Sequence, residues 1–116
     1  MDLTKYLHIF LKDSQEHLQR MDEQLLQLKR HPEDAEAIDG LFRSVHSIKG
    51  MSTTMGFDEP TQIAHSLESF LDPYRMGDQG LDPHAIDLLL RGVHLLRQSV
   101  ARVGGEGDGG QGEGER

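Results

Sequence analysis

The stretch FRSVHSIKGM, residues 42–51, contains both the pattern that decides the fold and an anomaly within it. Its apolar residues recur at the three-to-four-residue spacing that places them on one face of an α-helix. Yet the same stretch holds a polar His46 and a glycine, Gly50, and glycine costs roughly 1 kcal/mol relative to alanine inside a helix. The sequence therefore predicts a helix here in which the histidine and the glycine need a reason of their own.

The rest of the chain repeats this amphipathic pattern. Apolar stripes predict helices over residues 3–29, 34–54 and 83–103, with a further helix that starts near Asp58. The stripes consist of Leu3, Leu7, Phe10, Leu18, Met21, Leu25, Leu28, Ile38, Leu41, Phe42, Val45, Ile48, Met55, Ile63, Ala64, Leu67, Phe70, Leu71, Tyr74, Ile86, Leu89, Leu90, Val93, Leu96, Val100 and Val103. Amphipathic helices joined by short turns predict an all-α fold, an up-down-up-down antiparallel four-helix bundle.

Residues with special backbone or capping properties mark the helix ends. Gly56 is suited to end the second helix in a left-handed conformation, and Asp58 is expected to cap the third. Asp82 followed by Pro83 has the order of a cap and a first helical residue. Pro73 removes a backbone donor, so we expect a kink or an early end of the third helix there.

The 116 residues suit one domain with one modest core. We assign residues 1–103 to that domain. Residues 104–116 contain glycine and charged or polar residues with no apolar side chain, so they predict a flexible Gly/Glu-rich linker.

Composition excludes several classes of function. A net charge of −8 and a pI near 5.2 would repel a phosphate backbone, which argues against nucleic-acid binding. The chain has no cysteine, so it has neither disulfides nor a thiolate site. It shows no signal peptide, and its apolar runs are shorter than the ~20 residues that span a bilayer. We expect a cytoplasmic protein without membrane partners.

Helical-wheel geometry places a carboxylate near His46. At ~100° per residue, His46 lies beside Val45 at the edge of the second helix's apolar stripe, and Glu68 lies beside Leu67 at the corresponding edge of the third. His46 precedes Gly56 by ten residues and Glu68 follows it by twelve, so both are roughly 15–18 Å from that turn. The two side chains therefore share a height and either converge across the seam or diverge. The wheel alone does not decide which.

Convergence would create a nucleophile. A glutamate that accepts the Nδ1 proton of imidazole fixes the tautomer and leaves the Nε2 lone pair free. It also stabilises the positive charge that grows on the ring as Nε2 attacks an electrophile. Lys49 is placed to neutralise phosphoryl oxygens at Nε2. Gly50, without a side chain, would leave space for a protein partner to reach His46.

Two motifs carry a resemblance to a known family. The segment LFRSVHSIKGMSTTMGF followed by IAHSLESFLD closely resembles the histidine phosphotransfer domain at the N-terminus of CheA-type chemotaxis histidine kinases. The resemblance covers residues 3–103. It implies that His46 is phosphorylated, that Lys49 is the nearby lysine and that Gly50 is the small residue beside the site. It also implies that Glu68 orients the imidazole, with His65 as a further partner behind it.

The resemblance further implies the partners. A separate kinase domain binds the ATP and phosphorylates the histidine, and the phosphoryl group then passes to an aspartate of a response regulator receiver domain. The fragment itself is expected to be a phosphotransfer domain rather than an enzyme, monomeric, with no cofactor of its own. Its parent chain is expected to be a CheA-type protein histidine kinase.

Two other interpretations remain open from the residues alone, and a third is set aside. One is a non-catalytic helical interaction module in which His46 is merely packed, and another is a stand-alone phosphorelay protein. A metal site in the bundle would need more inward carboxylates than His65-x-x-Glu68 supplies, so none is predicted.

Overall fold

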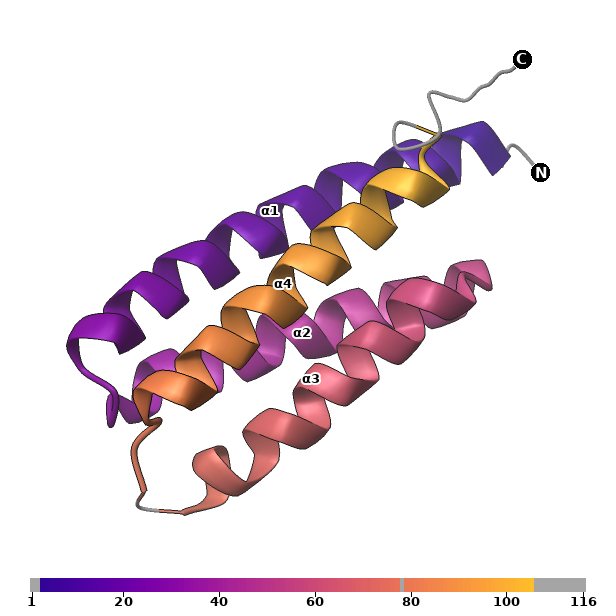
Figure 1. Ribbon diagram of the computed structural model, residues 1–116. Helices are drawn as coiled ribbons and strands as arrows, with labels where there is room; N and C mark the ends of the chain where they lie inside the picture. Colours follow the sequence, from indigo (N-terminus) through magenta and orange to yellow (C-terminus); the bar gives the residue numbers. More distant parts are fainter. Residues whose placement is uncertain (1–2, 78, 106–116) are drawn as a thin grey trace.

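The computed structural model describes residues 3–77 and 79–105, and every regular element in these ranges is an α-helix. Figure 1 shows the elements in chain order. They are α1 (Leu3–Arg30), α2 (Ala35–Met55), α3 (Asp58–Met76) and α4 (Pro83–Val103).

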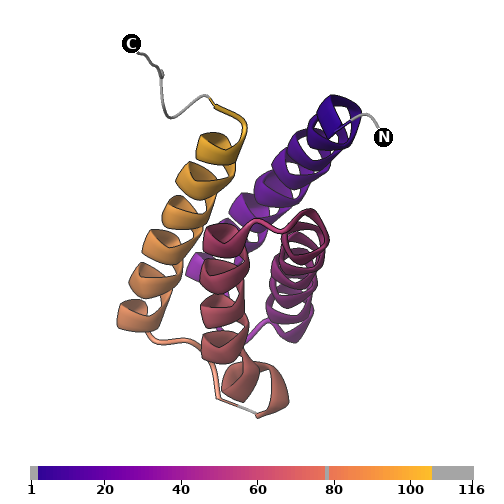
Figure 2. The same ribbon diagram turned by 90° about the vertical axis from the view of Figure 1, so that its right-hand side faces the viewer.

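The helices form an antiparallel bundle in which each is joined to the next by a short turn. α2 packs most extensively against α3, α1 lies between α2 and α4, and α3 packs on α4 to close the ring. The view in Figure 2, turned by 90°, shows the α2–α3 pair side by side with α4 against α3. The predicted all-α, up-down-up-down four-helix bundle is therefore confirmed.

One apolar core runs along the bundle axis. Its buried members come from all helices and include Phe10, Leu18, Met21, Leu25, Leu28, Leu41, Val45, Ile48, Leu67, Leu71, Leu89, Val93, Leu96 and Val100. Two stripe residues were wrong as core positions. Leu3 is 68% exposed because it lies in the first turn of α1, which is longer than its neighbours. Leu90 is 37% exposed because it lies ~40° outside Ile86 on the solvent side of α4.

Side chains and backbone at the helix ends explain where α2 and α4 begin and end. Asp34 caps α2 by accepting from the amides of Glu36 and Ala37, at 3.1 and 3.2 Å. Gly56 ends α2 at φ 76°, the left-handed conformation predicted for it. Asp82 caps α4 by accepting from the Ala85 amide at 2.7 Å, and Pro83 is its first residue.

The start of α3 differs from the prediction, and of the two outcomes expected at Pro73, a kink or an early end, the early end does not occur. The residue that caps α3 is Phe57 rather than Asp58. The Phe57 carbonyl accepts a hydrogen bond from the Thr61 amide at 3.3 Å, which starts α3. The Phe57 amide still donates to the Ser52 carbonyl at the end of α2, at 2.9 Å. α3 also does not end early at Pro73 but continues to Met76.

The last turn of α3 is held by contacts that offset the donor missing at Pro73. Arg75 binds Asp39 of α2 and Asp72 of its own helix, and Tyr74 packs against the core. These side-chain contacts supply an anchor that propensity alone does not include.

α4 ends at Val103, where the amides of Gly104 and Gly105 donate to Ala101 and Arg102. The predicted linker, residues 104–116, otherwise lies outside the described residues. Within the described part of the chain, no helix is long and apolar enough to cross a membrane.

Candidate functional site

His46 and Glu68 meet across the seam between α2 and α3. Nδ1 of His46 is hydrogen-bonded to Oε2 of Glu68. The imidazole side chain is 62% exposed, whereas the glutamate side chain is only 11% exposed. The two flanks of the helical wheels therefore converge, and a buried carboxylate holds an exposed ring by one nitrogen.

Lys49 occupies the other oxygen of the same carboxylate. Its Nζ donates to Glu68 Oε1 at 2.6 Å. The lysine side chain is 26% exposed, so it binds the carboxylate that holds the histidine and still reaches solvent. Both oxygens of Glu68 are thus engaged, one by the ring and one by the cation.

This arrangement determines the charge state of Glu68. Burial by itself raises the pKa of its carboxyl, but the hydrogen bonds from Lys49 and His46 and the positive charge of Lys49 outweigh burial. The net effect is that the pKa of Glu68 lies below its usual value, so the group is an anion at neutral pH.

The ionised carboxylate fixes the tautomer of His46. A carboxylate only accepts hydrogen bonds, so the shared proton is carried by Nδ1. Nε2 is then the nitrogen with the free lone pair, on a ring that is mostly in solvent. The site can therefore supply an exposed nitrogen nucleophile whose developing positive charge is balanced from behind.

Gly50 leaves the approach to this nitrogen open. Beyond its chain neighbours and the backbone of its own helical turns, a Cβ placed on Gly50 would meet no atom within 4 Å, so packing within the bundle does not require a glycine here. The residue lines an open groove of about 620 Å³ between α1 and α2, together with Tyr6, Ile9, His46 and Met51. The open space at Gly50 is consistent with access for a partner.

An aromatic ring and an arginine extend the site along α2. The ring of Phe42, one turn before His46, is nearly parallel to the imidazole, with an angle of 8° and centroids 6.2 Å apart. The guanidinium carbon of Arg75 lies 4.3 Å from the centroid of the Phe42 ring. The sequence assigned Phe42 only to the core. Its i, i+4 spacing to His46 was the available signal for this contact.

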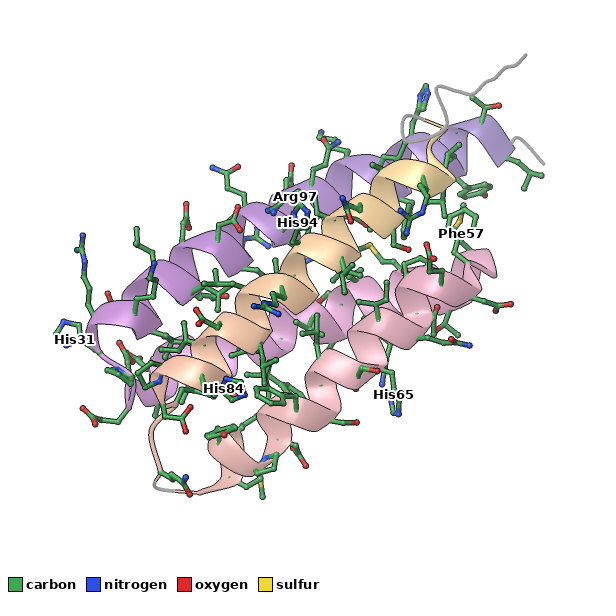
Figure 3. All side chains as sticks on the ribbon, in the orientation of Figure 1. His31, Phe57, His65, His84, His94 and Arg97 are labelled. Carbon is green, nitrogen blue, oxygen red and sulfur yellow. The ribbon has the colours of Figure 1, made fainter. Side chains whose placement is uncertain are left out.

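His65 does not join the group. It lies one turn before Glu68 on α3 with an exposed side chain, and Figure 3 shows it pointing outward from the helix. Among the described residues it has no hydrogen bond or ion pair with His46, Lys49 or Glu68. No contact in the described residues supports a role for His65 behind Glu68, and that role stays a prediction.

The cluster is small as a set of metal ligands. No group of three or more His, Cys, Asp or Glu side chains suited to a metal ion occurs in residues 3–77 and 79–105. The absence of a metal from this domain stays a prediction.

Comparison with known proteins places these residues in context. Residues 5–105 match the family described as the Hpt domain. The chemotaxis protein CheA of Bacillus subtilis is 38% identical over 109 residues, a match that spans 94% of this chain and 16% of that protein. The chain thus corresponds to about one sixth of the length of that relative.

Solved structures agree with the fold. The CheA phosphotransferase domain from Thermotoga maritima is 33% identical and superimposes with a TM-score of 0.81, covering 89% of this chain and 98% of that one. A solution structure of the histidine phosphotransfer domain of CheA is 34% identical, also with a TM-score of 0.81, covering 91% of this chain and 80% of that one.

Proposed function

Because the chain belongs to the Hpt domain family, we propose that His46 is the residue that receives the phosphoryl group and passes it on. The observation that carries the assignment is the pairing of Nδ1 with a buried carboxylate while the ring remains 62% exposed. Of the two ring nitrogens, only Nε2 then has a free lone pair that faces an incoming phosphorus.

The first transfer would take its phosphoryl group from ATP bound to a separate kinase domain. The Nε2 lone pair attacks the γ-phosphorus, the new N–P bond forms, and the P–O bond to the β-phosphate breaks so that ADP leaves. The ring becomes formally cationic while Nδ1 keeps its proton, and the Glu68 carboxylate stabilises that charge. Lys49 neutralises charge on the transferred oxygens from one turn away.

The second transfer reverses this order of bonds. A carboxylate oxygen of an aspartate in a receiver domain attacks the phosphorus, the N–P bond breaks, and neutral imidazole is restored. Such a phosphoryl acceptor needs no phosphate-binding loop of its own, because each partner brings its own phosphate site. The open space at Gly50 suits a site that must be reached by two different proteins in turn.

The partners and parent chain are part of the same proposal. The Bacillus subtilis relative is a chemotaxis protein of about six times this length. We infer a parent chain of the CheA type, in the cytoplasm, in which a kinase domain phosphorylates His46 and a response regulator receives the group. The domain binds no cofactor in this scheme.

Labelling with γ-³²P-ATP and a CheA-type kinase ATP-binding domain tests the assignment. The wild-type chain is expected to acquire label that is labile in acid and stable in base, as a phosphohistidine is, and His46→Gln is expected to acquire none.

The matched control is His65→Gln, a histidine of the same bundle with an exposed side chain. It should label like the wild type. Label that persists in His46→Gln, or a wild-type chain that takes up none, refutes the assignment and leaves a helical interaction module as the reading.

A further inference from the structure

The hydrogen bond to Glu68 leaves one motion of the His46 ring undetermined. It holds a single atom, Nδ1, at the edge of the ring. An edge contact of this kind allows the ring to rock about that atom, and the ring is 62% exposed, so solvent does not restrain it. The Nε2 lone pair lies in the plane of the ring, so the plane sets the direction of attack. A contact on the face of the ring is needed to fix that direction.

Phe42 provides this face contact. The two rings are parallel to within 8°, and their centroids are 6.2 Å apart, which is within the range of offset-stacked aromatic pairs. Phe42 is half-buried and packs against the core, so its ring is more firmly placed than the imidazole. The core therefore holds the Phe42 ring, and the Phe42 ring in turn sets the plane of the exposed imidazole.

Arg75 secures Phe42 from the other helix. Its guanidinium lies 4.3 Å from the Phe42 centroid, the geometry of a cation–π contact. The guanidinium is itself held by two carboxylates, with Nε 3.2 Å from Asp39 Oδ1 and Nη1 3.6 Å from Asp72 Oδ1. Asp39, Phe42 and His46 follow one another along α2 at spacings of three and four, which places them on one side of the helix.

We propose that Phe42, secured by Arg75, is a positioning residue that fixes the plane of the His46 imidazole and thereby aims Nε2. The proposal rests on phosphorylation of His46 and deepens it. It also gives the last turn of α3, which continues past Pro73, a role in the chemistry, because that turn carries Arg75.

Two variants test the proposal, one at the ring of Phe42 and one at the guanidinium of Arg75 that contacts it. Phe42→Leu keeps an apolar side chain but loses the flat face, and Arg75→Gln loses the cation. Matched controls are Phe70→Leu, a half-buried ring of α3 paired with Tyr74 at 5.8 Å, and Arg97→Gln, which removes an ion pair with Asp22 at 2.7 Å between α4 and α1. Thermal unfolding shows that each variant is folded before its kinetics are measured.

Kinetics with two phosphodonors distinguish a loss of the correct direction of Nε2 attack from a loss of binding to the partner protein. With a kinase ATP-binding domain and ATP, we expect kcat to fall on the order of tenfold in both variants while KM stays unchanged, because the protein-bound donor cannot move to meet a misdirected ring. With phosphoramidate, whose P–N bond breaks as Nε2–P forms and ammonia leaves, we expect a near-wild-type rate, because a small donor adapts to the ring. Phe42→Tyr restores the face and should restore kcat.

Magnetic resonance of the imidazole gives a readout that does not depend on phosphorylation. The order parameters of the His46 ring C–H bonds should fall in Phe42→Leu and Arg75→Gln and stay unchanged in both controls. Unchanged ring order and unchanged kcat in the two variants would overturn the proposal. So would a rise in KM alone, which would make Phe42 a docking residue instead. A wild-type chain that is not labelled refutes the proposed function, while the ring-order comparison still decides whether Phe42 fixes the ring.

Discussion

At the scale of single residues, Glu68 connects the core to the chemistry. It is 8% exposed, yet it binds an exposed ring with one oxygen and a cation with the other. Breaking such an arrangement is costly because it leaves a buried charge without partners. The same residue that orients His46 therefore also stabilises the packing of α2 on α3.

The stabilising contribution of Glu68 should depend on pH. Its pKa is lowered from 4.5 in the folded chain: burial raises it, but the hydrogen bonds from Lys49 and His46 and the charge of Lys49 lower it by more. A carboxyl whose folded pKa is depressed contributes stability above its unfolded pKa and loses it as pH falls through the folded value. Near neutral pH the wild type should exceed Glu68→Gln by about 1–3 kcal/mol in the free energy of unfolding, and this difference should shrink below pH 4.5.

Urea denaturation of both proteins between pH 7 and pH 3 measures this difference. The control is Glu23→Gln, on an exposed position of α1, whose curve should run parallel to that of the wild type. A difference between wild type and Glu68→Gln that stays constant, or grows, toward low pH contradicts the prediction.

Residue spacing predicted which side chains could meet at the site but not their partners. The wheel angles placed His46 and Glu68 on matching flanks, but they carry no information on which way the bundle turns, so convergence had to come from the structure. Lys49 was predicted to face an incoming phosphate, and the structure also pairs it with Glu68. The contact of Arg75 with Phe42 joins residues 33 positions apart in the chain, which local spacing does not reveal.

At the scale of elements, two glycines near the end of α2 have opposite physical roles. Gly50 lies inside the helix with open space beside it, whereas Gly56 ends the helix at a positive φ of 76°. Only the second has a conformation that an L-residue rarely adopts.

Substitution by alanine should therefore change the free energy of unfolding in opposite directions at Gly50 and Gly56. Gly50→Ala is expected to raise the free energy of unfolding by up to about 1 kcal/mol, because alanine is the better helix former. Gly56→Ala is expected to lower it by about 1–2 kcal/mol, because of the left-handed conformation. Chemical denaturation of the two variants checks both, and each serves as the control for the other.

A labelling experiment then separates stability from access at Gly50. If the glycine keeps the approach open, the more stable Gly50→Ala should transfer phosphate more slowly than the wild type, and Gly50→Leu more slowly still. Wild-type rates in both would show that the glycine does not serve access.

α3 shows where local rules for helix ends fail. The early end that the missing donor at Pro73 made one expected outcome does not occur, because that expectation took no account of Arg75 and Tyr74, which follow it. Their contacts with α2 and the core hold one further turn. By contrast, the cap at Asp82 depends on the Ala85 amide three residues away, and it was predicted.

At the scale of the whole molecule, the hydrogen-bonded group of the site lies on half of the bundle, while α1 contributes one wall of the groove beside His46. His46, Lys49 and Glu68 all lie on α2 and α3, which pack more extensively on each other than α4 packs on either neighbour. α1 and α4 complete the core, and neither makes a hydrogen bond to the imidazole or its carboxylate in the described ranges.

A truncation in the core of α4 should therefore lower stability without lowering the rate of phosphorylation. Leu96 is fully buried in α4, so Leu96→Ala should lower the free energy of unfolding by about 2–5 kcal/mol. Per folded molecule, its rate of phosphorylation should equal that of the wild type, as measured by labelling at a temperature where unfolding curves show the variant to be folded.

The matched truncation is Ile48→Ala, equally buried but in α2, the helix that carries His46. It should lower both stability and rate. A folded Leu96→Ala protein that labels slowly would mean that the reactive centre depends on the whole bundle.

The turn at Gly56 has a consequence for the speed with which the site forms. The two residues of its central contact lie 22 positions apart in the chain, on a hairpin of two helices. The entropy lost in closing a loop grows slowly with its length, and loops of about ten residues close in roughly 10–100 ns. After a local opening, a phosphohistidine site on such a hairpin therefore re-forms as fast as a short chain segment closes. It does not have to wait for contacts between the distant ends of the chain.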